Sequence, residues 1–572
     1  MSQLTYTLPP DLATAVQQVL DDWQNTGRME SLWGRDATVW TGSDEAHWLG
    51  WLTIAKESLD QLGELQVFAQ EVAASGIRHV VLLGMGGSSM APEVMRDTYG
   101  SGAGYPSLEV LDSTDPAQVR AVENAVDLQH TLFIVASKSG STLEPNILKA
   151  YFFQRMVDTI GAAQAASHFV AITDPDSSLD VNASDEGFKR IFHGEPDVGG
   201  RFSALSNFGI VPAALIGVDC RRFLESTLDM VAACEADQPV AENPGAVLGC
   251  IMGVAASVGR DKLTIIAGPQ LASIGAWLEQ LVAESTGKQG TGVIPVDGEP
   301  TGAPDVYGGD RMFVYISLDG AADPQQEQAV TQLEDAGQAV VRISLPDVYC
   351  LGQEMFRWEV ATAVAGSVLN VNPFDQPDVE ASKIETRKIT EAYEAGEALP
   401  EEPLLAGDDV LALYTDGRNA AELRAACGDE VTVANVIKAH LDRIVPGDYL
   451  ALLAYLQRDA ANTSRLQEIR LATRDAGKVA TCLGFGPRFL HSTGQAYKGG
   501  PNSGVFLQLT ADPVEDLPVP GHKYTFGLVE AAQARGDFEV LAERERRVLR
   551  VHLGSDVAAG LERLGELMAG SP

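Results

Sequence analysis

The sequence predicts an α/β fold with doubly wound parallel sheets, and three observations lead to this prediction. From residue 76 onward, short apolar runs alternate with longer stretches of helical periodicity. Polar loops rich in Gly or Ser directly follow two of these runs, at residues 84–89 and 137–142. The chain also has 572 residues, more than one ordinary hydrophobic core holds. Strands that alternate with helices form parallel sheets, which bind ligands at the carboxyl ends of the strands.

We divide the chain into four predicted parts. Residues 1–75 form a helical preface, because apolar residues recur there at helical spacing. Residues 76–240 and 241–395 form two α/β domains with a ligand cleft between them. After an acidic, Pro-bearing connector at residues 394–403, residues 396–572 form a C-terminal α/β extension that closes the cleft.

The strands of the two domains are predicted from apolar runs bounded by turn residues. In the first domain they are residues 79–83, 108–111, 131–136 and 169–173. The polar stretch 174–200 is interpreted as a surface excursion without a sheet strand. In the second domain a helix over 244–258 precedes strands at 262–266, 312–317 and 339–343.

Composition excludes several classes of function. The chain has 41 basic and 79 acidic residues, a net charge of −38, which opposes non-specific binding to nucleic acid and to anionic membranes. No apolar run approaches ~18 residues, and the first residues lack the pattern of a signal peptide, so we expect no membrane span and a cytoplasmic location. Six scattered cysteines without a Cys-x-x-Cys pair indicate neither a zinc cluster nor a disulfide scaffold.

The loop at residues 137–142 is predicted to hold a phosphate. Ser137, Ser139 and Thr142 crowd hydroxyls and free backbone amides around Lys138 at the start of a helix. Helix capping alone is the alternative explanation, but it needs only one of these side chains.

Residues 277–290 read WLEQLVAESTGKQG and predict a helix that packs one side into the core and ends near Gly287. Gln280 and Glu284 lie one turn apart on it. A partly desolvated carboxylate at the end of a packed helix suits a general base, although by position alone such a Glu is more often solvated.

Five motifs stand in one order along the chain. They are Gly-Gly-Ser at 86–88, Ser-Lys-Ser-Gly-Ser-Thr at 137–142, Gly-Gly-Arg at 199–201, Gln-x-x-x-Glu-Ser-x-Gly-Lys at 280–288, and Asp-Gln followed by Lys at 375–383. In sequence and order they resemble the phosphoglucose isomerase family. The resemblance covers residues 76–383 and is closest to the isomerase half of bacterial fusions of transaldolase with glucose-6-phosphate isomerase.

This resemblance implies two domains of the sugar-isomerase (SIS) type and a metal-independent, cofactor-free isomerase of glucose 6-phosphate and fructose 6-phosphate in glycolysis and gluconeogenesis. The implied enzyme is a homodimer with a phosphosugar substrate. Ser137, Ser139 and Thr142 would hold the phosphate, while Gly87 and Ser88 would line the sugar.

The resemblance also implies the catalytic residues. Glu284 would move the proton between C2 and C1, and Arg201 would stabilise the negative charge of the enediolate. Gln280 and Gln376 belong to the motifs that bind substrate, and Lys383 would take part in opening the sugar ring.

One residue departs from the family pattern. The animal-type enzymes carry a ring-opening His between the catalytic Glu and the Asp-Gln motif, yet this chain has no His between Glu284 and Lys383. His491, in the stretch FLHSTGQAYKGG at 489–500, is our candidate for that role. A purely structural His is the alternative, with Lys383 or Lys498 opening the ring instead.

Two other functions stay open. An isomerase that also accepts mannose 6-phosphate would differ only in the face on which the enediolate is protonated. A non-catalytic phosphosugar regulator would need the Ser-rich loop but not Glu284 with Arg201, and would be expected to carry a basic DNA-binding unit.

Overall fold

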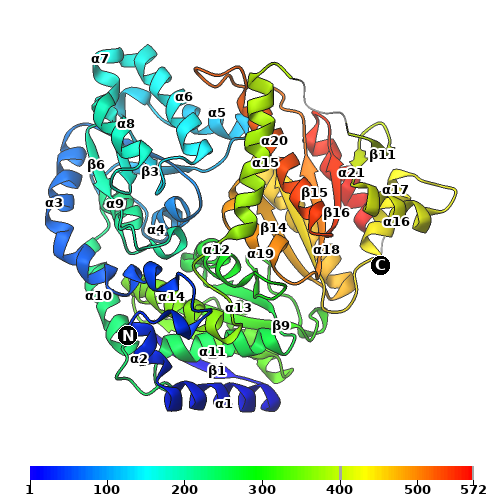
Figure 1. Ribbon diagram of the computed structural model, residues 1–572, viewed down its shortest axis with the longest axis horizontal. Coiled ribbons are helices and arrows are strands. Elements are labelled where there is room, and N and C mark those ends of the chain that lie inside the picture. Colours follow the sequence, from blue (N-terminus) through cyan, green and yellow to red (C-terminus); the bar gives the residue numbers. More distant parts are fainter. Residues whose placement is uncertain (398–401, 570–572) are drawn as a thin grey trace.

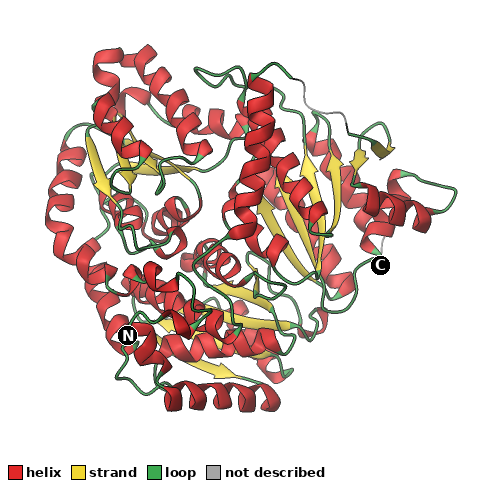
Figure 2. Cartoon of the chain, in the orientation of Figure 1, coloured by secondary structure: helices red, strands yellow, loops and turns green. Residues whose placement is uncertain are grey.

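The computed structural model describes residues 1–397 and 402–569, and the strands in these ranges form three sheets (Figure 1). Helices surround each group of strands (Figure 2). Part of the predicted connector, residues 398–401, lies outside the described residues.

The first sheet is parallel throughout and has the order β3-β2-β4-β5-β6. Its strands are β2 (His79–Gly84), β3 (Ser107–Leu111), β4 (Thr131–Ala136), β5 (Phe169–Thr173) and β6 (Arg190–His193). The sheet and its helices lie within residues 76–240, the range of the first predicted α/β domain. The helices are α4 (Met90–Tyr99), α5 (Pro116–Ala125), α6 (Leu143–Ile160), α7 (Ala162–Ala165), α8 (Ser178–Glu186), α9 (Asn207–Leu215) and α10 (Cys220–Ala233).

The second sheet has the order β1-β10-β9-β7-β8. Its strands are β1 (Gln3–Thr7), β7 (Lys262–Ala267), β8 (Ile294–Val296), β9 (Arg311–Leu318) and β10 (Ala339–Leu345). All neighbours are parallel except β1, which pairs antiparallel with β10. The helices are α11 (Pro244–Ser257), α12 (Ile274–Thr286), α13 (Pro324–Asp335), α14 (Leu351–Val368) and α15 (Pro377–Glu394).

The C-terminal extension has a third sheet in the order β11-β12-β16-β15-β13-β14. Its strands are β11 (Leu404–Gly407), β12 (Ala412–Tyr414), β13 (Tyr449–Tyr455), β14 (Ala480–Phe485), β15 (Gly504–Thr510) and β16 (Arg547–His552). The last four strands run parallel, and β11 and β12 add an antiparallel edge. The helices are α16 (Gly417–Cys427), α17 (Val433–Leu441), α18 (Ala460–Gly477), α19 (Gly494–Gly499), α20 (Phe526–Glu543) and α21 (Val557–Ala569).

Two expectations about local structure need correction. The N-terminal preface contains helices α1 (Pro10–Thr26), α2 (Arg28–Trp33) and α3 (Ile54–Ala74), but it is not only helical, because β1 joins the second sheet. The stretch 174–200 contains strand β6 beside β5. Both are short edge strands with few buried side chains, so their sequences lack the apolar runs that mark the central strands.

Helices α11 and α14 form the centre of the second domain and are buried over most of their length. Glycines every fourth residue on α11 let α14 approach closely. A Cβ atom at Gly245, Gly249 or Gly253 would lie 2.6 Å from a side-chain carbon of Val360, Val364 or Val368, respectively. This tight pair supports α12, which lies near the middle of Figure 1, between the three sheets.

Among residues 1–397 and 402–569, no helix has the length and apolar character needed to cross a membrane.

Candidate functional site

Helix α12 places Glu284 where the two sheet domains and the C-terminal extension meet. Its apolar face is buried, and Glu284 in its last turn is only 8% exposed. The helix ends at Gly287, where a Cβ atom would lie 2.3 Å from Cα of Ala496 in α19. Glycine is therefore needed there for close contact with the C-terminal extension, and this contact fixes the end of the helix beside Glu284.

Arg201 lies against Glu284. It belongs to a 3-10 turn, η7 (Gly200–Phe202), and its Nη1 is 3.4 Å from Oε1 of Glu284. The guanidinium also donates to Ser285 Oγ, to Gln376 Oε1 and to the backbone oxygens of Pro373 and Asp375.

Burial lowers the pKa of Arg201, and the nearby charge of Glu284 opposes this effect. Arginine still remains charged at neutral pH, because a guanidinium does not lose its proton in proteins. The site therefore contains a fixed positive charge beside the candidate base. Gln376 is exposed, so its contact with Arg201 is the one that a substrate oxygen can replace most easily.

Lys288, the last residue of the Gln-x-x-x-Glu-Ser-x-Gly-Lys motif, is buried near Glu284 and holds a neighbouring loop. Its ammonium is 2% exposed and donates to the backbone oxygen of Asn372 and to Asp375. Burial, followed by the charge of Arg201, lowers its pKa to about 7. Lys288 and Arg201 thus hold the same segment, residues 372–376, from two sides.

The Gly-Gly-Ser turn packs against two other site segments. It forms a 3-10 turn, η4 (Gly86–Ser88). A Cβ atom on Gly86 would lie 2.8 Å from Gln280 Nε2, and one on Gly87 would lie 1.9 Å from the backbone oxygen of Gly200. Glycine at these positions lets the turn approach α12 and the turn that presents Arg201. Ser88 is buried in the same turn.

The predicted phosphate loop precedes α6, an 18-residue helix. Ser137 Oγ donates to Thr142 Oγ1 at 3.2 Å, and Ser139 is exposed with its hydroxyl 3.0 Å from that of Ser141. Thr142 occupies the N-cap position, but its side chain makes no capping hydrogen bond. Capping therefore does not explain this group of hydroxyls. They stand instead at the positive end of a helix dipole, where an anion is stabilised.

Lys138 differs from its neighbours in the loop. Its ammonium pairs with Asp174 and donates to the backbone oxygen of Glu195 at 3.0 Å. The side chain therefore anchors the loop to the segment after β5 and is not gathered with the hydroxyls.

His491 comes to the same site from the C-terminal extension. It ends a 3-10 turn, η11 (Arg488–His491), and its backbone oxygen accepts from Gln280 Nε2 at 2.9 Å. The same Gln280 nitrogen donates to Glu284 Oε2 at 3.2 Å. Gln280 thus links the candidate base to the candidate ring-opening residue, which lies 207 residues later in the chain.

The imidazole of His491 has a carboxylate partner that sequence reasoning missed. Its Nε2 is 3.0 Å from Oε1 of Glu144, in the first turn of α6. Burial alone would raise the pKa of Glu144, but its hydrogen bond with His491 and the nearby Lys383 outweigh this effect, so the pKa is lowered. A carboxylate only accepts hydrogen bonds, so Nε2 carries a proton and Nδ1 is the ring nitrogen left to face a substrate.

A buried ion cluster docks the turn that carries His491. Arg488 pairs with Asp112 at 2.8 Å and with Glu93, and Arg458 donates to Glu93 at 2.7 Å. Asp112 also accepts from Ser89, directly after the Gly-Gly-Ser turn. The C-terminal extension is thereby attached to the first domain at the loop next to the site.

The two lysines proposed for ring opening lie in different environments. Lys383 is exposed on α15, pairs with Glu380 at 3.5 Å and contributes to lowering the pKa of Glu144, so it lies near the site without a direct contact to it. Lys498 is 1% exposed and pairs with Asp537 at 2.6 Å inside the C-terminal extension. A lysine held in that buried pair is unavailable to a sugar.

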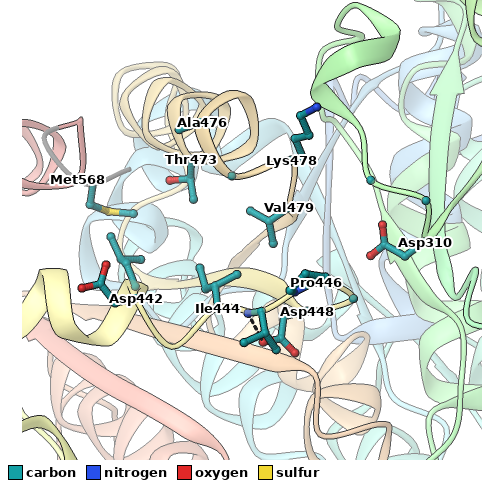
Figure 3. Close-up of a pocket in the computed structure, with 16 residues that line it drawn as sticks. Asp310, Asp442, Ile444, Pro446, Asp448, Thr473, Ala476, Lys478, Val479 and Met568 are labelled. Carbon is teal, nitrogen blue, oxygen red and sulfur yellow. Dashed lines mark hydrogen bonds between the residues drawn. The ribbon is translucent and has the colours of Figure 1, made fainter. Parts of the chain in front are cut away.

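A cavity of about 760 Å³ lies away from these residues (Figure 3). Asp310, Asp448 and Val479 line it just before strands β9, β13 and β14 begin. It is therefore at the amino ends of these strands, whereas the loops of the candidate site follow carboxyl ends. Ligands of parallel sheets bind at carboxyl ends, so we do not assign the substrate to this cavity. No group of three or more His, Cys, Asp or Glu in the described ranges is arranged to hold a metal ion.

Comparisons with known proteins point to one family. The model of the family described as phosphoglucose isomerase matches residues 61–303. A glucose-6-phosphate isomerase from Parabacteroides distasonis is 29% identical over 402 residues, which are 61% of this chain and 88% of the relative. One from Nostoc punctiforme is 30% identical over 388 residues, covering 58% of this chain and 71% of the relative.

Solved structures support the same fold. A hypothetical protein from Thermus thermophilus matches with a TM-score of 0.58 at 24% identity, over 68% of this chain and 99% of the other. A glucose-6-phosphate isomerase from Chlamydia trachomatis matches with a TM-score of 0.52 at 21% identity, over 64% and 78%. The two predicted parallel-sheet domains are thus found in solved proteins.

Proposed function

Since the chain belongs to the phosphoglucose isomerase family, we propose that it is a metal-independent aldose-ketose isomerase that interconverts glucose 6-phosphate and fructose 6-phosphate. The two relatives named above are glucose-6-phosphate isomerases, and this chain matches 88% and 71% of their lengths. The residues of the candidate site supply the groups that the reaction needs.

The first step is opening of the sugar ring. His491, with Nε2–H held by Glu144, presents Nδ1 as the atom that takes the proton of the anomeric hydroxyl. A carboxylate that fixes the tautomer and orientation of an imidazole acts in the same way in hydrolases. Lys383 lies near enough to lower the pKa of Glu144, and we propose it as the second group in this step.

The second step moves a proton between C2 and C1. Glu284 takes the proton from one carbon and returns it to the other through a cis-enediolate. Negative charge develops on the substrate oxygens during this step, and the buried Arg201 beside Glu284 stabilises it. Gln376 accepts a hydrogen bond from the same Arg201, and in this step the enediolate oxygen replaces Gln376 as the acceptor.

The phosphate is proposed to bind at the loop before α6. Ser137, Ser139 and Thr142 donate to it, and the helix dipole offsets the repulsion from the strongly acidic chain. Glu144 follows Thr142 by two residues, so the phosphate anchor and the partner of His491 share one helical turn.

One observation supports this proposal most directly. Gln280 donates from one nitrogen to both Glu284 and the backbone oxygen of His491, so the turn that carries the imidazole is held beside the base although the two come from different domains. A phosphosugar sensor needs no such arrangement of a base, a buried cation and a carboxylate-paired imidazole.

A coupled assay of fructose 6-phosphate conversion in the presence of a chelator tests the function. We expect full activity with the chelator, and a loss of about 10²-fold to 10⁴-fold for Glu284→Gln with substrate affinity retained. Binding without turnover by the wild type would identify a phosphosugar sensor. Activity of Glu284→Gln above about a tenth of wild type would assign the base elsewhere. Parallel turnover of mannose 6-phosphate would identify the dual isomerase.

We also propose a cytoplasmic homodimer. Free thiols at all six cysteines suit a reducing compartment. The dimer rests on the family resemblance alone, because Glu284, Arg201, Glu144 and His491 come from a single chain. Light scattering across a range of protein concentrations tests it, and a monomeric mass throughout would refute it.

A further inference from the structure

A second segment of the C-terminal extension reaches the partner of His491. Gln533, on α20, is 2% exposed, and its Nε2 donates to Oε1 of Glu144 at 2.6 Å. Its Oε1 accepts from Thr114 Oγ1 at 2.6 Å, in the loop between β3 and α5. The amide therefore connects the loop before α5 with the first turn of α6, from a helix that lies more than 380 residues later in the chain.

The chemistry of the neighbours sets the orientation of this amide. A carboxylate accepts hydrogen bonds and cannot donate them, so the nitrogen of Gln533 must face Glu144. With the oxygen turned toward Thr114, both ends of the amide are satisfied. Rotation by 180° would place its oxygen against the carboxylate, so Gln533 is fixed in one state.

Oxygen Oε1 of Glu144 therefore accepts two hydrogen bonds, one from His491 and one from Gln533. We propose that Gln533 is a positioning residue for ring opening, which keeps Glu144 as the carboxylate that holds His491 with Nδ1 toward the sugar. This inference rests on the proposed function and deepens it, because it gives the C-terminal extension a second part in the same step.

Loss of the amide would change the state of the pair. Glu144 is 4% exposed, so burial favours its protonated form, and the hydrogen bonds that its carboxylate accepts oppose this. With one donor removed, the pair takes up one more proton more easily: Nε2 gives its proton to the carboxyl group while Nδ1 takes a proton from solvent. Glu144 would then donate to Nε2, and Nδ1 would carry the proton that it should accept. His491 would be present but in the wrong tautomer.

Two substitutions at this position test the proposal. Gln533→Leu keeps the size of the side chain and removes the donor. Gln533→Glu keeps the shape and replaces the donor with a group that donates only while it is protonated. Gln508→Leu is the matched control, since Gln508 is equally buried in the extension and donates to Ala534 of the same helix without touching Glu144.

Two substrates separate the steps. Cyclic glucose 6-phosphate requires ring opening, whereas a four-carbon aldose 4-phosphate has no free hydroxyl that could close a ring. For the second compound we would measure deuterium uptake at C2 from heavy water. We expect Gln533→Leu to lower kcat/KM for the cyclic sugar about tenfold to a hundredfold and to leave exchange on the open-chain sugar within twofold.

The pH profile gives a readout that a merely structural role would not change. Two adjacent buried carboxyl groups cannot both ionise easily, so in Gln533→Glu the new acid is protonated and donates to Glu144 at low pH. We expect this variant to be within about threefold of wild type near pH 5.5 and at least tenfold weaker near pH 8.5. In Gln533→Leu and Gln508→Leu, activity relative to wild type should not fall in this way between pH 5.5 and pH 8.5.

The possible failures are distinguishable. Equal losses on both substrates, or an unchanged pH profile in Gln533→Glu, would overturn the role of Gln533 while leaving the isomerase activity of the wild type intact. A wild type that does not convert cyclic glucose 6-phosphate at all would instead overturn the proposed function. A selective loss in Gln508→Leu as large as that in Gln533→Leu would reduce the effect to general packing of the extension and would also overturn the proposal.

Discussion

Substitution of Gly87 by Ala tests how closely the turns of the site must approach. The added Cβ atom would lie 1.9 Å from the backbone oxygen of Gly200, whereas such contacts are essentially never shorter than 3.0 Å. The two turns must therefore separate by about 1 Å. Because the turn with Gly200 presents Arg201, the guanidinium would move by a similar amount relative to the substrate.

A displacement of about 1 Å in a catalytic group costs on the order of 10²-fold in rate. We therefore expect kcat of Gly87→Ala to fall about a hundredfold, while KM changes little because the phosphate loop is not part of this contact. Overpacking should also lower the free energy of unfolding by about 1–3 kcal/mol. The coupled assay would be run at 20 °C, where circular dichroism can verify that the variant is folded.

Gly63→Ala is the matched control. Gly63 lies within α3, and a Cβ atom there would have no neighbour within 4 Å. This variant should keep full activity and gain stability of about 0.5–1 kcal/mol, because Ala favours a helix over Gly. A Gly87→Ala enzyme with kcat within about threefold of wild type would refute the reasoning that the turn contact sets the position of Arg201.

Three further predictions follow from the site. Replacing Ser139 and Thr142 together with Ala should raise KM and weaken inhibition by phosphorylated sugar acids; a loss in kcat at unchanged KM would assign the loop to the reacting end of the sugar. His491→Ala should slow conversion of the cyclic sugar phosphate but spare proton exchange on an open-chain one, and equal losses on both would indicate a structural residue. The pKa of Lys288 is lowered to about 7 from 10.5, so the unfolded chain binds more protons between these values. The free energy of unfolding of the wild type, relative to that of Lys288→Met, should therefore rise with pH from about 7 toward 10 by up to ~1.4 kcal/mol per pH unit. Denaturant titrations of both proteins at pH 7 and pH 9 measure this. A difference between wild type and variant that is the same at both pH values would contradict the prediction.

The sequence was sufficient for the central strands but not for the edges of the sheets. Strands β4 and β5 have the predicted boundaries, because each is a fully buried apolar run between turn residues. Strand β1 was missed because its side chains are mostly exposed and its partner, β10, lies more than 330 residues later. Such a pairing depends on the open edge of a distant sheet, which leaves no local pattern.

For the candidate site, too, the sequence was sufficient for some residues and not for others. Motifs led to Glu284 and Arg201, and these two residues are in contact. Glu144 was not found, because an acidic residue in the first turn of a helix is explained equally well by the helix dipole. Its partner His491 lies 347 residues away, and no spacing rule connects them. For Lys138 the motif gave the position in the loop but not the acidic partner Asp174, which lies 36 residues later.

The docking of the C-terminal extension has a consequence for the order in which the chain is synthesised. Glu284 and Arg201 leave the ribosome with the first half of the protein and can pair as soon as the second domain folds. Glu144 must wait until η11 and α20 have emerged, because these segments supply its donors and cover it. During that interval Asp112 lacks Arg488, and Glu93 keeps only Arg96 of its three arginine partners. Chains truncated after the second domain should therefore leave Glu144 and Asp112 without the partners that the extension supplies.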